Sequence, residues 1–456
     1  MTDKNIDMAV KIASLVSQQG GTAYFVGGYV RDRIRHKDNK DIDIEIHGIY
    51  PHQLEVILDS LGERISIGES FGIYNLKGYS LDIAMPRKED NRGGGHKDFE
   101  ICVDPFIGTY KAAQRRDFTF NALLEDIMTG NIIDHFGGVE DLNNGIIRHI
   151  SDKTFIEDPL RVLRAAQFAA RFNYTVATET IDLCRQMDLS SLSKERIIGE
   201  LEKAMLKSDK PSIFFESLRQ MNQLSVWFPE LEQTIGVKQN PKHHAEGDVW
   251  THTMMVANVA VEYRDKVSNP LGFMLSAITH DFGKALCTEL VNGEIHAYNH
   301  ETVGLPLVEA FMMRLTTAKS LIEYVMNLSE FHMKPNMLAA DNSSIKSTNK
   351  LFDQSVDPEA LIYLAISDGL GKIAPREYIS YDDFFKKRLE IFREYMSRPY
   401  VMGRDLIAAG MSPSERFSEY LEYTHKLRLA GVEKENALRQ TLALARKKGD
   451  YERADT

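Results

Sequence analysis

The chain has 456 residues, of which 43% are hydrophobic and 27% are charged, as in folded proteins of several domains. Its net charge of −11 argues against a protein coated in nucleic acid, although a local basic groove is compatible with it. The sequence has no run of about 18 apolar residues and no signal-peptide core near its start, so neither a membrane partner nor secretion is expected. Cys102, Cys184 and Cys287 lie far apart and predict free thiols in a reducing, cytoplasmic setting.

Short helices and strands alternate over the first 150 residues. Apolar residues at helical spacing predict helices over 5–19 and 51–61. Short apolar or alternating runs predict strands over 22–26, 41–46, 64–67, 72–76 and 80–84. Together they predict a small mixed sheet with helices, an α+β domain. Residues 86–99 hold three consecutive glycines among charges and predict a flexible loop, either one that closes over a substrate or an ordinary surface loop.

The segment 24–47 carries the first sign of chemistry. Side chains alternate along a strand, so Asp41, Asp43 and Glu45 share one face while the isoleucines between them point toward a core. Neighbouring carboxylates repel and weaken a strand unless a cation offsets their charge, and hard oxygen ligands select Mg²⁺. Asp82, in the last predicted strand of the sheet, is a candidate third carboxylate.

Gly27 and Gly28 precede a short cationic helix in the same segment. Glycine lets the backbone approach a phosphate closely, and N–H groups at a helix start can donate to it. An ordinary glycine turn beside a polar strand face is the alternative. The ordered combination of a phosphate cradle and a carboxylate pair favours phosphoryl or nucleotidyl transfer.

From about residue 151 onward the strand signals fade and helical patterns dominate. Helices are expected over 158–172, 177–188, 194–206, 210–223, 249–263, 271–279, 303–314, 318–331, 357–366, 381–396 and 432–448. The second half of the chain is therefore expected to be all-α.

Two clusters in the middle of the chain suit nucleotide contacts. Arg115 and Arg116 are adjacent, and a guanidinium group binds phosphate bidentately. Further on, Glu157 and Asp158 lie four and three residues before Arg161, which is expected to place all three on one helical face. A surface ion pair at a helix start is the plain alternative.

The pair of Asp158 and Arg161 can also select a base. Cytosine and adenine each present an exocyclic amine beside a ring-nitrogen acceptor, so an aspartate can accept from the amine while an arginine donates to the ring nitrogen. Uracil and guanine present a carbonyl and an N–H at these places, and each unmatched buried polar group costs about 1–3 kcal/mol. One Asp–Arg pair could thus accept CTP and ATP and reject UTP and GTP.

With these motifs in place, the sequence resembles the class II tRNA nucleotidyltransferases (CCA-adding enzymes) and the related bacterial poly(A) polymerases. The resemblance rests on GGYVRD and DID in the opening stretch, RRDFTFNAL at 115–123, DHFGG at 134–138, EDPLRVLRAAQFAARF at 157–172 and LSKERIIGELEKAM at 192–205. It implies that Asp41 and Asp43 bind the catalytic Mg²⁺ and that Asp158 and Arg161 serve as the template for the incoming base. The nucleotide-binding residues that it implies are Gly27, Gly28, Arg31, Arg115, Arg116, Asp117, Asn121, Glu157, Asp158, Arg161 and Arg164.

Histidines gather in a second region of the chain. Seven of the fourteen fall between positions 243 and 332. An ordered set of His252, the adjacent pair His280-Asp281 and Asp368 can hold a divalent metal that activates water, and His300 with His332 can complete a second site.

This ordered set resembles the HD phosphohydrolase domain, over about residues 240–375. The resemblance implies phosphodiesterase or phosphatase activity on nucleotides or RNA 3′ ends. It also implies a divalent transition metal (Mn, Ni, Fe, Co or Zn) or Mg²⁺.

The expected architecture is α+β in four parts. A nucleotidyltransferase (polymerase-β-like) head over 1–150 is followed by a helical neck over 151–230, an HD domain over 231–395 and a helical tail over 396–456.

The expected activity is template-independent addition of CMP and AMP from CTP and ATP to the tRNA 3′ end, by a two-metal mechanism. Three alternatives stay open: an A-adding, CC-adding or poly(A) polymerase with the same chemistry, a protein whose main activity is the HD hydrolase, and a non-catalytic RNA-binding module. The oligomeric state stays open as well.

Overall fold

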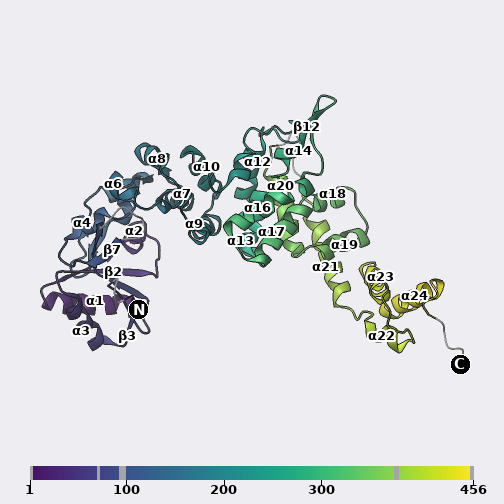
Figure 1. Ribbon diagram of the computed structural model, residues 1–456, viewed down its shortest axis with the longest axis horizontal. Helices are drawn as coiled ribbons and strands as arrows, with labels where there is room; N and C mark the ends of the chain where they lie inside the picture. The colour runs from purple at the N-terminus through teal and green to yellow at the C-terminus, as the bar shows by residue number, and fades with distance from the viewer. Residues whose placement is uncertain (1–3, 69–71, 92–98, 374–378, 452–456) are drawn as a thin grey trace. The chain divides into compact units, whose positions relative to one another are not determined.

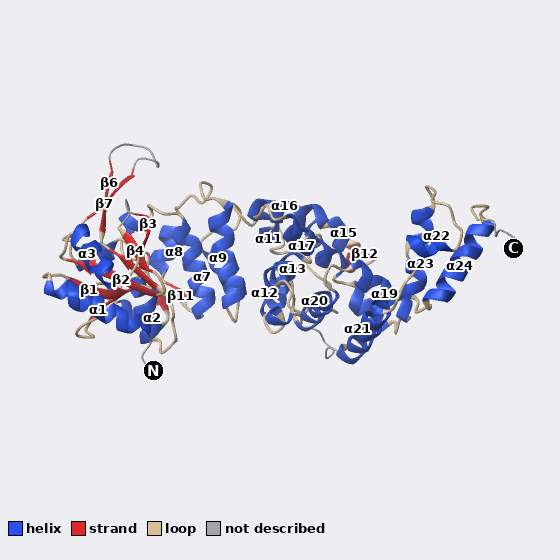
Figure 2. Ribbon diagram, turned by 90° about the horizontal axis from the view of Figure 1, so that it is seen from below, coloured by secondary structure: helices blue, strands red, loops and turns tan. Residues whose placement is uncertain are grey.

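The computed structural model describes residues 4–68, 72–91, 99–373 and 379–451. The chain divides into two compact units, the first formed by residues 1–201 with 213–223, and the second by residues 202–212 with 224–456. Figure 2 shows that most strands belong to the first unit, whereas the second is built almost entirely of helices. This is an α+β chain, as the sequence predicted.

A seven-stranded mixed sheet forms the centre of the first unit (Figure 1). Its strand order is β3-β4-β5-β2-β1-β8-β9, and β2 and β5 run parallel while the other neighbouring pairs are antiparallel. The strands are β1 (Thr22–Val26), β2 (Ile42–His47), β3 (Arg64–Gly68), β4 (Ile73–Leu76), β5 (Leu81–Ala84), β8 (Leu124–Asp126) and β9 (Ile132–Ile133). The first five were predicted from the sequence to within one residue or so at each end, whereas β8 and β9 were missed.

One face of this sheet is buried under helices α1 (Lys4–Gln18) and α3 (Pro51–Leu61). Ile42, Ile44 and Ile46 of β2 are at most 2% exposed and pack in the same core as side chains of both helices. The predicted alternation is therefore correct, because the acidic residues between the isoleucines turn to the opposite face.

A two-stranded hairpin corrects the loop predicted at 86–99. Strand β6 (Arg87–Asn91) pairs antiparallel with β7 (Phe99–Val103), so extended backbone begins directly after Pro86. The three glycines fall within 92–98, which lie outside the described residues.

The remaining elements up to residue 220 are mostly short, with two longer helices among them. They are α2 (Gly28–Ile34), α4 (Thr109–Gln114), η2 (Thr119–Asn121), α5 (Gly138–Asn144), β10 (Ile146–Ile147), α6 (Asp152–Phe155), α7 (Leu160–Phe172), β11 (Thr175–Val176), α8 (Thr178–Cys184), α9 (Lys194–Lys207) and α10 (Ser212–Gln220). Phe168 of α7 packs edge-on against Phe118 and Phe120, with ring centroids 5.8 and 5.5 Å apart. These aromatic contacts tie α7 to the segment that follows Arg115 and Arg116.

In the second unit, helix α13 (Pro270–Thr279) lies at the centre. It packs against α12 (Val249–Ala260), α17 (Lys319–Phe331) and α20 (Pro358–Leu370), and its residues from Gly272 to Thr279 are buried. The other elements are α11 (Pro229–Glu232), η3 (Arg264–Lys266), α14 (Lys284–Cys287), α15 (His300–Val303), α16 (Leu305–Leu315), α18 (Lys334–Ala340), α19 (Ile345–Gln354), α21 (Asp382–Ser397), α22 (Gly403–Ala408), α23 (Phe417–Leu429) and α24 (Lys434–Lys447).

The expectation of an all-α chain after about residue 151 is wrong at the short strand β11 and at a hairpin in the second unit. Strands β12 (Thr288–Val291) and β13 (Glu294–Ala297) form an antiparallel hairpin, seen near the top of Figure 1. Asn292 and Gly293 form its two-residue turn with φ of 50° and 83°, and Asn-Gly is the residue pair that such turns favour. In the part of the chain that the structure describes, no helix is long and apolar enough to cross a membrane.

Candidate active sites

The parallel pairing of β2 and β5 brings two carboxylates side by side. Asp43 stands opposite Asp82 in the register, and Asp41 directly precedes β2. Burial, with Asp82 beside it, raises the pKa of Asp43, so the ionised pair is unfavourable without a cation. The donor set of carboxylate oxygens fits a hard divalent ion such as Mg²⁺. Asp43 and Asp82 thus lie on adjacent strands, and Asp41 lies directly before the first of them.

The glycine turn lies against this acidic cluster. Gly27 has a φ of 65°, and a Cβ at this position would lie 3.5 Å from Asp43 Oδ2 and 3.0 Å from Arg116 Nη1. The positive φ favours glycine here, and a larger side chain would push against the end of Arg116. Arg116 reaches the same place, so a cation and a close backbone approach adjoin the carboxylates.

Glu45 holds Arg116 in this position. Arg116 Nη2 donates to Glu45 Oε2 at 3.3 Å, and Glu45 Oε1 lies 2.8 Å from His47 Nε2. Burial would raise the pKa of Glu45, but His47 and Arg116 lower it, so the carboxylate stays ionised. Sequence reasoning gave Glu45 no role, although it had placed the residue on the same strand face as Asp43.

Four of the predicted nucleotide-binding residues form one network, buried except at Arg164. Arg31 Nη1 donates to Asn121 Oδ1 at 2.8 Å, and Asn121 Nδ2 donates to Asp117 Oδ1 at 2.9 Å. Arg164 Nε then donates to Asp117 Oδ2 at 2.7 Å. Arg31 is also paired with its neighbour Asp32 at 2.8 Å. Charge-assisted bonds of this kind fix α2, η2 and α7 relative to one another within the first unit.

Asp158 and Arg161 have different partners from those expected. Helix α7 begins at Leu160, so Glu157 and Asp158 lie just before the helix. Burial lowers the pKa of Arg161, and the charges of both carboxylates act against that effect, so they lie near its guanidinium group. Asp158 pairs with Arg196 at 2.9 Å. Arg161 donates to the carbonyl oxygens of Thr154 and Arg115, at 2.6 and 2.8 Å.

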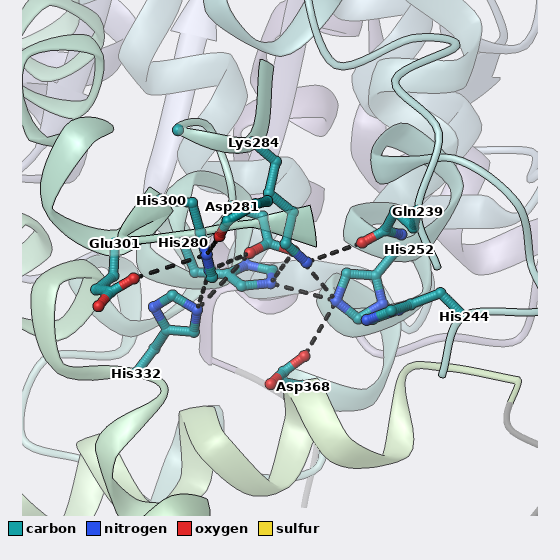
Figure 3. A network of polar contacts seen from close by, with 12 residues as sticks. Gln239, His244, His252, His280, Asp281, Lys284, His300, Glu301, His332 and Asp368 are labelled. Carbon is teal, nitrogen blue, oxygen red and sulfur yellow. Dashed lines mark hydrogen bonds and ion pairs between the residues drawn. The ribbon is translucent and has the colours of Figure 1, made fainter. Parts of the chain in front are cut away.

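A second centre lies among the helices of the second unit, and Figure 3 shows its side chains converging. His252 comes from α12, the pair His280-Asp281 follows α13, and His332 follows α17. His300 begins α15 and Asp368 lies in α20. All six residues are at most 7% exposed. The structure brings together every residue of the predicted histidine–aspartate set.

Asp281 lies between the two halves of this centre. Its Oδ2 is 3.5 Å from His252 Nε2 and 3.3 Å from His280 Nε2. Its Oδ1 is 3.1 Å from His300 Nε2 and 3.7 Å from His332 Nε2. Burial would raise the pKa of Asp281, but Lys284 and His280 hold it well below its usual value. A charged carboxylate that faces four imidazoles can bridge two cation positions.

Backbone carbonyls orient three of the imidazoles. His280, His300 and His332 each have Nδ1 within 2.7–3.0 Å of the carbonyl oxygen three residues before. A neutral imidazole that donates from Nδ1 presents a lone pair at Nε2, which is the state that binds metal. In these three side chains the Nε2 atoms therefore point into the centre.

The converging atoms fit a bound cation. The Nε2 atoms of His280 and His252 are 3.4 Å apart, as are those of His300 and His332. Asp281 Oδ1 is buried and has no well-aligned hydrogen-bond donor among the described residues, although His300 Nε2 is close to it. Facing lone pairs and a buried carboxylate oxygen repel unless a positive charge lies between them. His252, His280 and Asp368 can share one ion, and so can His280, Asp281 and His332.

Two residues that contact the candidate metal ligands were not predicted from the sequence. Glu246 Oε1 lies 3.2 Å from His252 Nδ1, the nitrogen that faces away from the centre. Lys284 Nζ donates to Asp281 Oδ2 at 2.6 Å and to Gln239 Oε1 at 2.8 Å. Lys284 follows Asp281 by three residues, a helical spacing that could have indicated the contact. Nothing local in the sequence marks Glu246.

Comparison with known proteins gives these two centres a context. A family model described as "Poly A polymerase head domain" matches residues 23–148, and one described as "Probable RNA and SrmB- binding site of polymerase A" matches residues 173–235. The "Multifunctional CCA protein" of Actinobacillus pleuropneumoniae serotype 5b (strain L20) is 34% identical over 324 residues, 69% of this chain and 76% of the relative. The protein of that name from Pasteurella multocida (strain Pm70) is 33% identical over 401 residues, 85% of this chain and 91% of the relative.

Solved structures share the fold over nearly the whole chain. The Thermotoga maritima CCA-adding enzyme complexed with tRNA_CCA superposes with a TM-score of 0.64 at 19% identity, covering 97% of this chain and 96% of that one. The Bacillus stearothermophilus CCA-adding enzyme in complex with CTP gives 0.67 at 18% identity, covering 98% and 99%.

The sheet with its acidic cluster and the helical unit with its histidine–aspartate centre define a nucleotidyltransferase that carries a second candidate metal centre. The chain belongs to the family of class II CCA-adding enzymes and poly(A) polymerases, in the group of relatives named multifunctional CCA proteins. The head of this family implies a divalent metal.

Proposed function

We propose that this chain completes or repairs the 3′ end of tRNA by adding CMP and AMP from CTP and ATP, without a nucleic-acid template. The observation that carries the proposal is the register of β2 and β5, which sets Asp43 beside Asp82 and next to the Gly27 turn. The names of the relatives support it, since both are called multifunctional CCA proteins. Solved CCA-adding enzymes in complex with tRNA, CTP or ATP share the fold of this chain, which agrees with the proposal.

In this proposal the residues of the head bind and orient the reactants. Asp41, Asp43 and Asp82 would hold Mg²⁺, which when bound would supply the positive charge that activates the RNA 3′-OH and neutralises the triphosphate. The 3′-oxygen would bond to the α-phosphorus and lose its proton to water, and pyrophosphate would leave as its bond to that phosphorus breaks. Arg116 contacts the phosphates from the position in which Glu45 holds it. The Gly27 backbone lets the triphosphate approach, because no side chain fills that space. Rate enhancement then comes from positioning and charge, so no protein general base is needed.

We propose that Asp158 and Arg161 select the incoming base. Asp158 would exchange Arg196 for the exocyclic amine of cytosine or adenine. Arg161 would exchange the carbonyl oxygens of Thr154 and Arg115 for the ring nitrogen. Glu157, in the turn before α7, would orient Arg161. The network of Arg31, Asn121, Asp117 and Arg164 keeps this region rigid, and Arg115 adds a phosphate contact.

We propose a metal-dependent phosphohydrolase activity for the second centre. His252, His280, Asp281 and Asp368 would hold one cation, and His300 with His332 a second, which is Mn, Ni, Fe, Co, Zn or Mg. A bound metal would supply an activated water. In the hydrolysis the water oxygen bonds to phosphorus, the phosphorus–oxygen bond to the ribose breaks, and the ribose oxygen takes up a proton.

The division into a head over 1–150, a neck over 151–230, an HD domain over 231–395 and a tail over 396–456 stays part of the proposal, as does the cytoplasmic location. The competing products, A only, CC only or poly(A), need the same head chemistry. If the chain were mainly a hydrolase, or only bound RNA, the metal site formed by Asp41, Asp43 and Asp82 would have little role in its activity.

Incorporation of labelled nucleotides tests the head. The protein is incubated with Mg²⁺, labelled CTP or ATP, and tRNA transcripts that end at the discriminator base, at C or at CC. We expect each transcript to be extended to CCA, and Asp41→Ala to abolish extension while the control Asp59→Ala retains it. Undiminished incorporation by Asp41→Ala would show that the catalytic assignment is wrong.

Hydrolysis of phosphate esters tests the second centre separately. We expect wild type to release phosphate in a metal-dependent way, and Asp281→Asn to lose this activity while still extending tRNA. The exposed Asp341, changed to Asn, serves as the control. Equal hydrolysis by wild type and Asp281→Asn would sink the phosphohydrolase proposal and leave the head assignment intact.

A further inference from the structure

A cavity in the second unit lies between helices α20 and α21 and the short helix η3. Its volume is about 440 Å³, within the usual range for small-ligand pockets. Helix α20 also carries Asp368 of the histidine–aspartate centre, but none of the candidate metal ligands is among the described residues that line this cavity. The cavity is therefore a separate place for a ligand.

The floor of the cavity is apolar. Ile362 and Ile366 of α20 and Phe385 and Leu389 of α21 line it, and each is at most 8% exposed. The members of each pair are one helical turn apart, so both helices turn an apolar pair toward the same hydrophobic cluster. Such a floor favours a ligand with a flat, weakly polar body.

Two tyrosines add an aromatic wall to this floor. The rings of Tyr263 and Tyr363 stack with centroids 4.9 Å apart and planes 20° from parallel, and both pack against the hydrophobic cluster. Burial raises the pKa of both hydroxyls, and nearby carboxylates, including Asp382 of the cavity lining, raise it further. Both hydroxyls therefore stay protonated, and the rings offer uncharged faces on which a flat heterocycle can stack.

Glu359 orients the Tyr363 side of this wall. Tyr363 Oη donates to Glu359 Oε1 at 3.4 Å, and Arg393 of α21 pairs with Glu359 Oε2 at 2.7 Å. Exposed ion pairs of this kind contribute little to stability. This one nevertheless links the two helices beside the cavity and holds the carboxylate that the tyrosine hydroxyl contacts.

Charges of both signs line the rim of the cavity. They are the acidic Glu359, Asp382 and Glu390 and the basic Lys266, Lys386 and Arg393. A polyanion would face three carboxylates here, a polycation would face three cations, and a hydrocarbon would remove water from both sets without replacing its hydrogen bonds. An uncharged ligand with both donors and acceptors on its edge suits this rim best. A nucleobase has these properties, and bases stack on aromatic side chains.

We propose that this cavity binds a nucleobase, which stacks on the pair of Tyr263 and Tyr363 and turns its polar edge to the charged rim. Lys266 Nζ now lies 4.8 Å from the ring centroid of Tyr263 and 5.9 Å from that of Tyr363. Its side chain is exposed and flexible, so it gives way to the base. The base belongs either to a free nucleoside or to an unpaired position of bound RNA. This binding site depends on neither of the two activities proposed above.

Equilibrium binding to the full-length, metal-free protein tests the site. The ligands are adenosine and cytidine, which carry no phosphate, and tRNA lacking its 3′ end. We expect Tyr363→Ala to weaken the binding of the nucleosides, of the tRNA, or of both, roughly tenfold, because a stacking partner is lost. Tyr363→Phe keeps the ring and should bind as tightly as wild type.

Two further variants complete the design. Tyr400→Ala is the matched control, because Tyr400 is 46% exposed, lies under the guanidinium group of Arg428 and is outside the cavity lining. It should bind every ligand as wild type does. Tyr263→Leu removes the other ring while keeping an apolar side chain, and it takes the place of Tyr363→Ala if that variant does not fold.

The pattern of losses identifies the source of the base. Weaker nucleoside binding by Tyr363→Ala assigns the site to a free nucleoside, and a loss confined to tRNA assigns it to a base of bound RNA. If adenosine binds, photolabelling with 8-azidoadenosine should mark peptides of η3, α20 or α21, and excess adenosine should prevent the labelling. Labelling that avoids all three helices would overturn the assignment.

Two other results would also overturn the proposed site. One is equal affinity of wild type and Tyr363→Ala for adenosine, cytidine and tRNA alike. The other is binding of spermidine that requires Tyr363 while no nucleoside or tRNA binding does, since the occupant would then be an amine. Because all these measurements concern binding, the failure of either proposed activity would leave their result unaffected.

Discussion

Asp43 and Asp82 stand directly opposite each other on the parallel strands β2 and β5, with Asp43 carrying a raised pKa. Two carboxylates so placed repel each other, so the fold gives up stability for a site that attracts a cation. Asp43→Asn should therefore reduce nucleotide incorporation by about a thousandfold or more, as expected when a charge-stabilising group is lost. It should also leave the Tm of the metal-free protein unchanged or raise it.

Mg²⁺ titration of the Tm supplies a readout that does not depend on activity. Wild type should be stabilised by Mg²⁺, because a ligand that binds only the folded state shifts unfolding. Asp43→Asn should show a smaller shift. A drop in the metal-free Tm by many degrees would instead indicate that Asp43 is a structural residue.

Glu45 should act on substrate affinity through Arg116. Glu45→Gln removes the charge that holds Arg116 Nη2. We expect KM for both CTP and ATP to rise about fivefold, the equivalent of about 1 kcal/mol for one charge-assisted hydrogen bond. The steady-state constants of Glu45→Gln and of the surface control Glu63→Gln measure this. A fall in kcat with KM unchanged would contradict the positioning role.

The pair of Asp117 and Arg164 should make stability depend on pH in a defined direction. Burial would raise the pKa of Asp117, but Arg164 and Asn121 lower it from its ordinary value of 3.8. The stabilisation is therefore fully present above that value and is lost as pH falls through the lower pKa of the folded state. Asp117→Asn should cost about 1–3 kcal/mol of unfolding free energy at pH 7.

Denaturant titrations at several pH values check this. The difference in unfolding free energy between wild type and Asp117→Asn should shrink as the pH drops below 3.8. A difference that stays constant down to the lowest pH at which both proteins fold would rule out the ion pair as its source.

Glu246 should tune the metal affinity of the second centre. It faces the outer nitrogen of His252, and such contacts commonly change metal affinity by about 10–100-fold. Competition with a chromogenic chelator should show that Glu246→Gln binds metal about tenfold more weakly, with tRNA extension unchanged. Glu422, exposed and far along the chain, provides the matched Glu→Gln control. Identical affinities in Glu246→Gln and wild type would remove Glu246 from the site.

Local sequence patterns were sufficient for much of the fold and for the composition of both centres. The alternation of Asp41, Asp43 and Glu45 with isoleucines determined which face of β2 is buried, because strand period is independent of context. The candidate ligands that were grouped with His280-Asp281 converge in the structure. That grouping depended only on the order of these residues along the chain. The partner of Asp82, however, depends on the parallel register of two strands that are distant in sequence.

The sequence analysis failed where tertiary contacts decide. Asp158 pairs with Arg196, thirty-eight residues further on, and a contact between such distant positions cannot be predicted from local spacing. The β12–β13 hairpin was missed for a different reason, since its Asn292-Gly293 turn is a strong local signal that surrounding helical patterns outweighed.

The identity of the added nucleotides tests the central claim most directly. Purified tRNA lacking its 3′ end is incubated with the protein and Mg²⁺, and the products are sequenced at their 3′ ends. We predict growth to CC with CTP alone, growth to CCA with CTP and ATP together, and no addition with UTP or GTP. A run of A residues, random addition, or unchanged tRNA under all conditions would contradict the account.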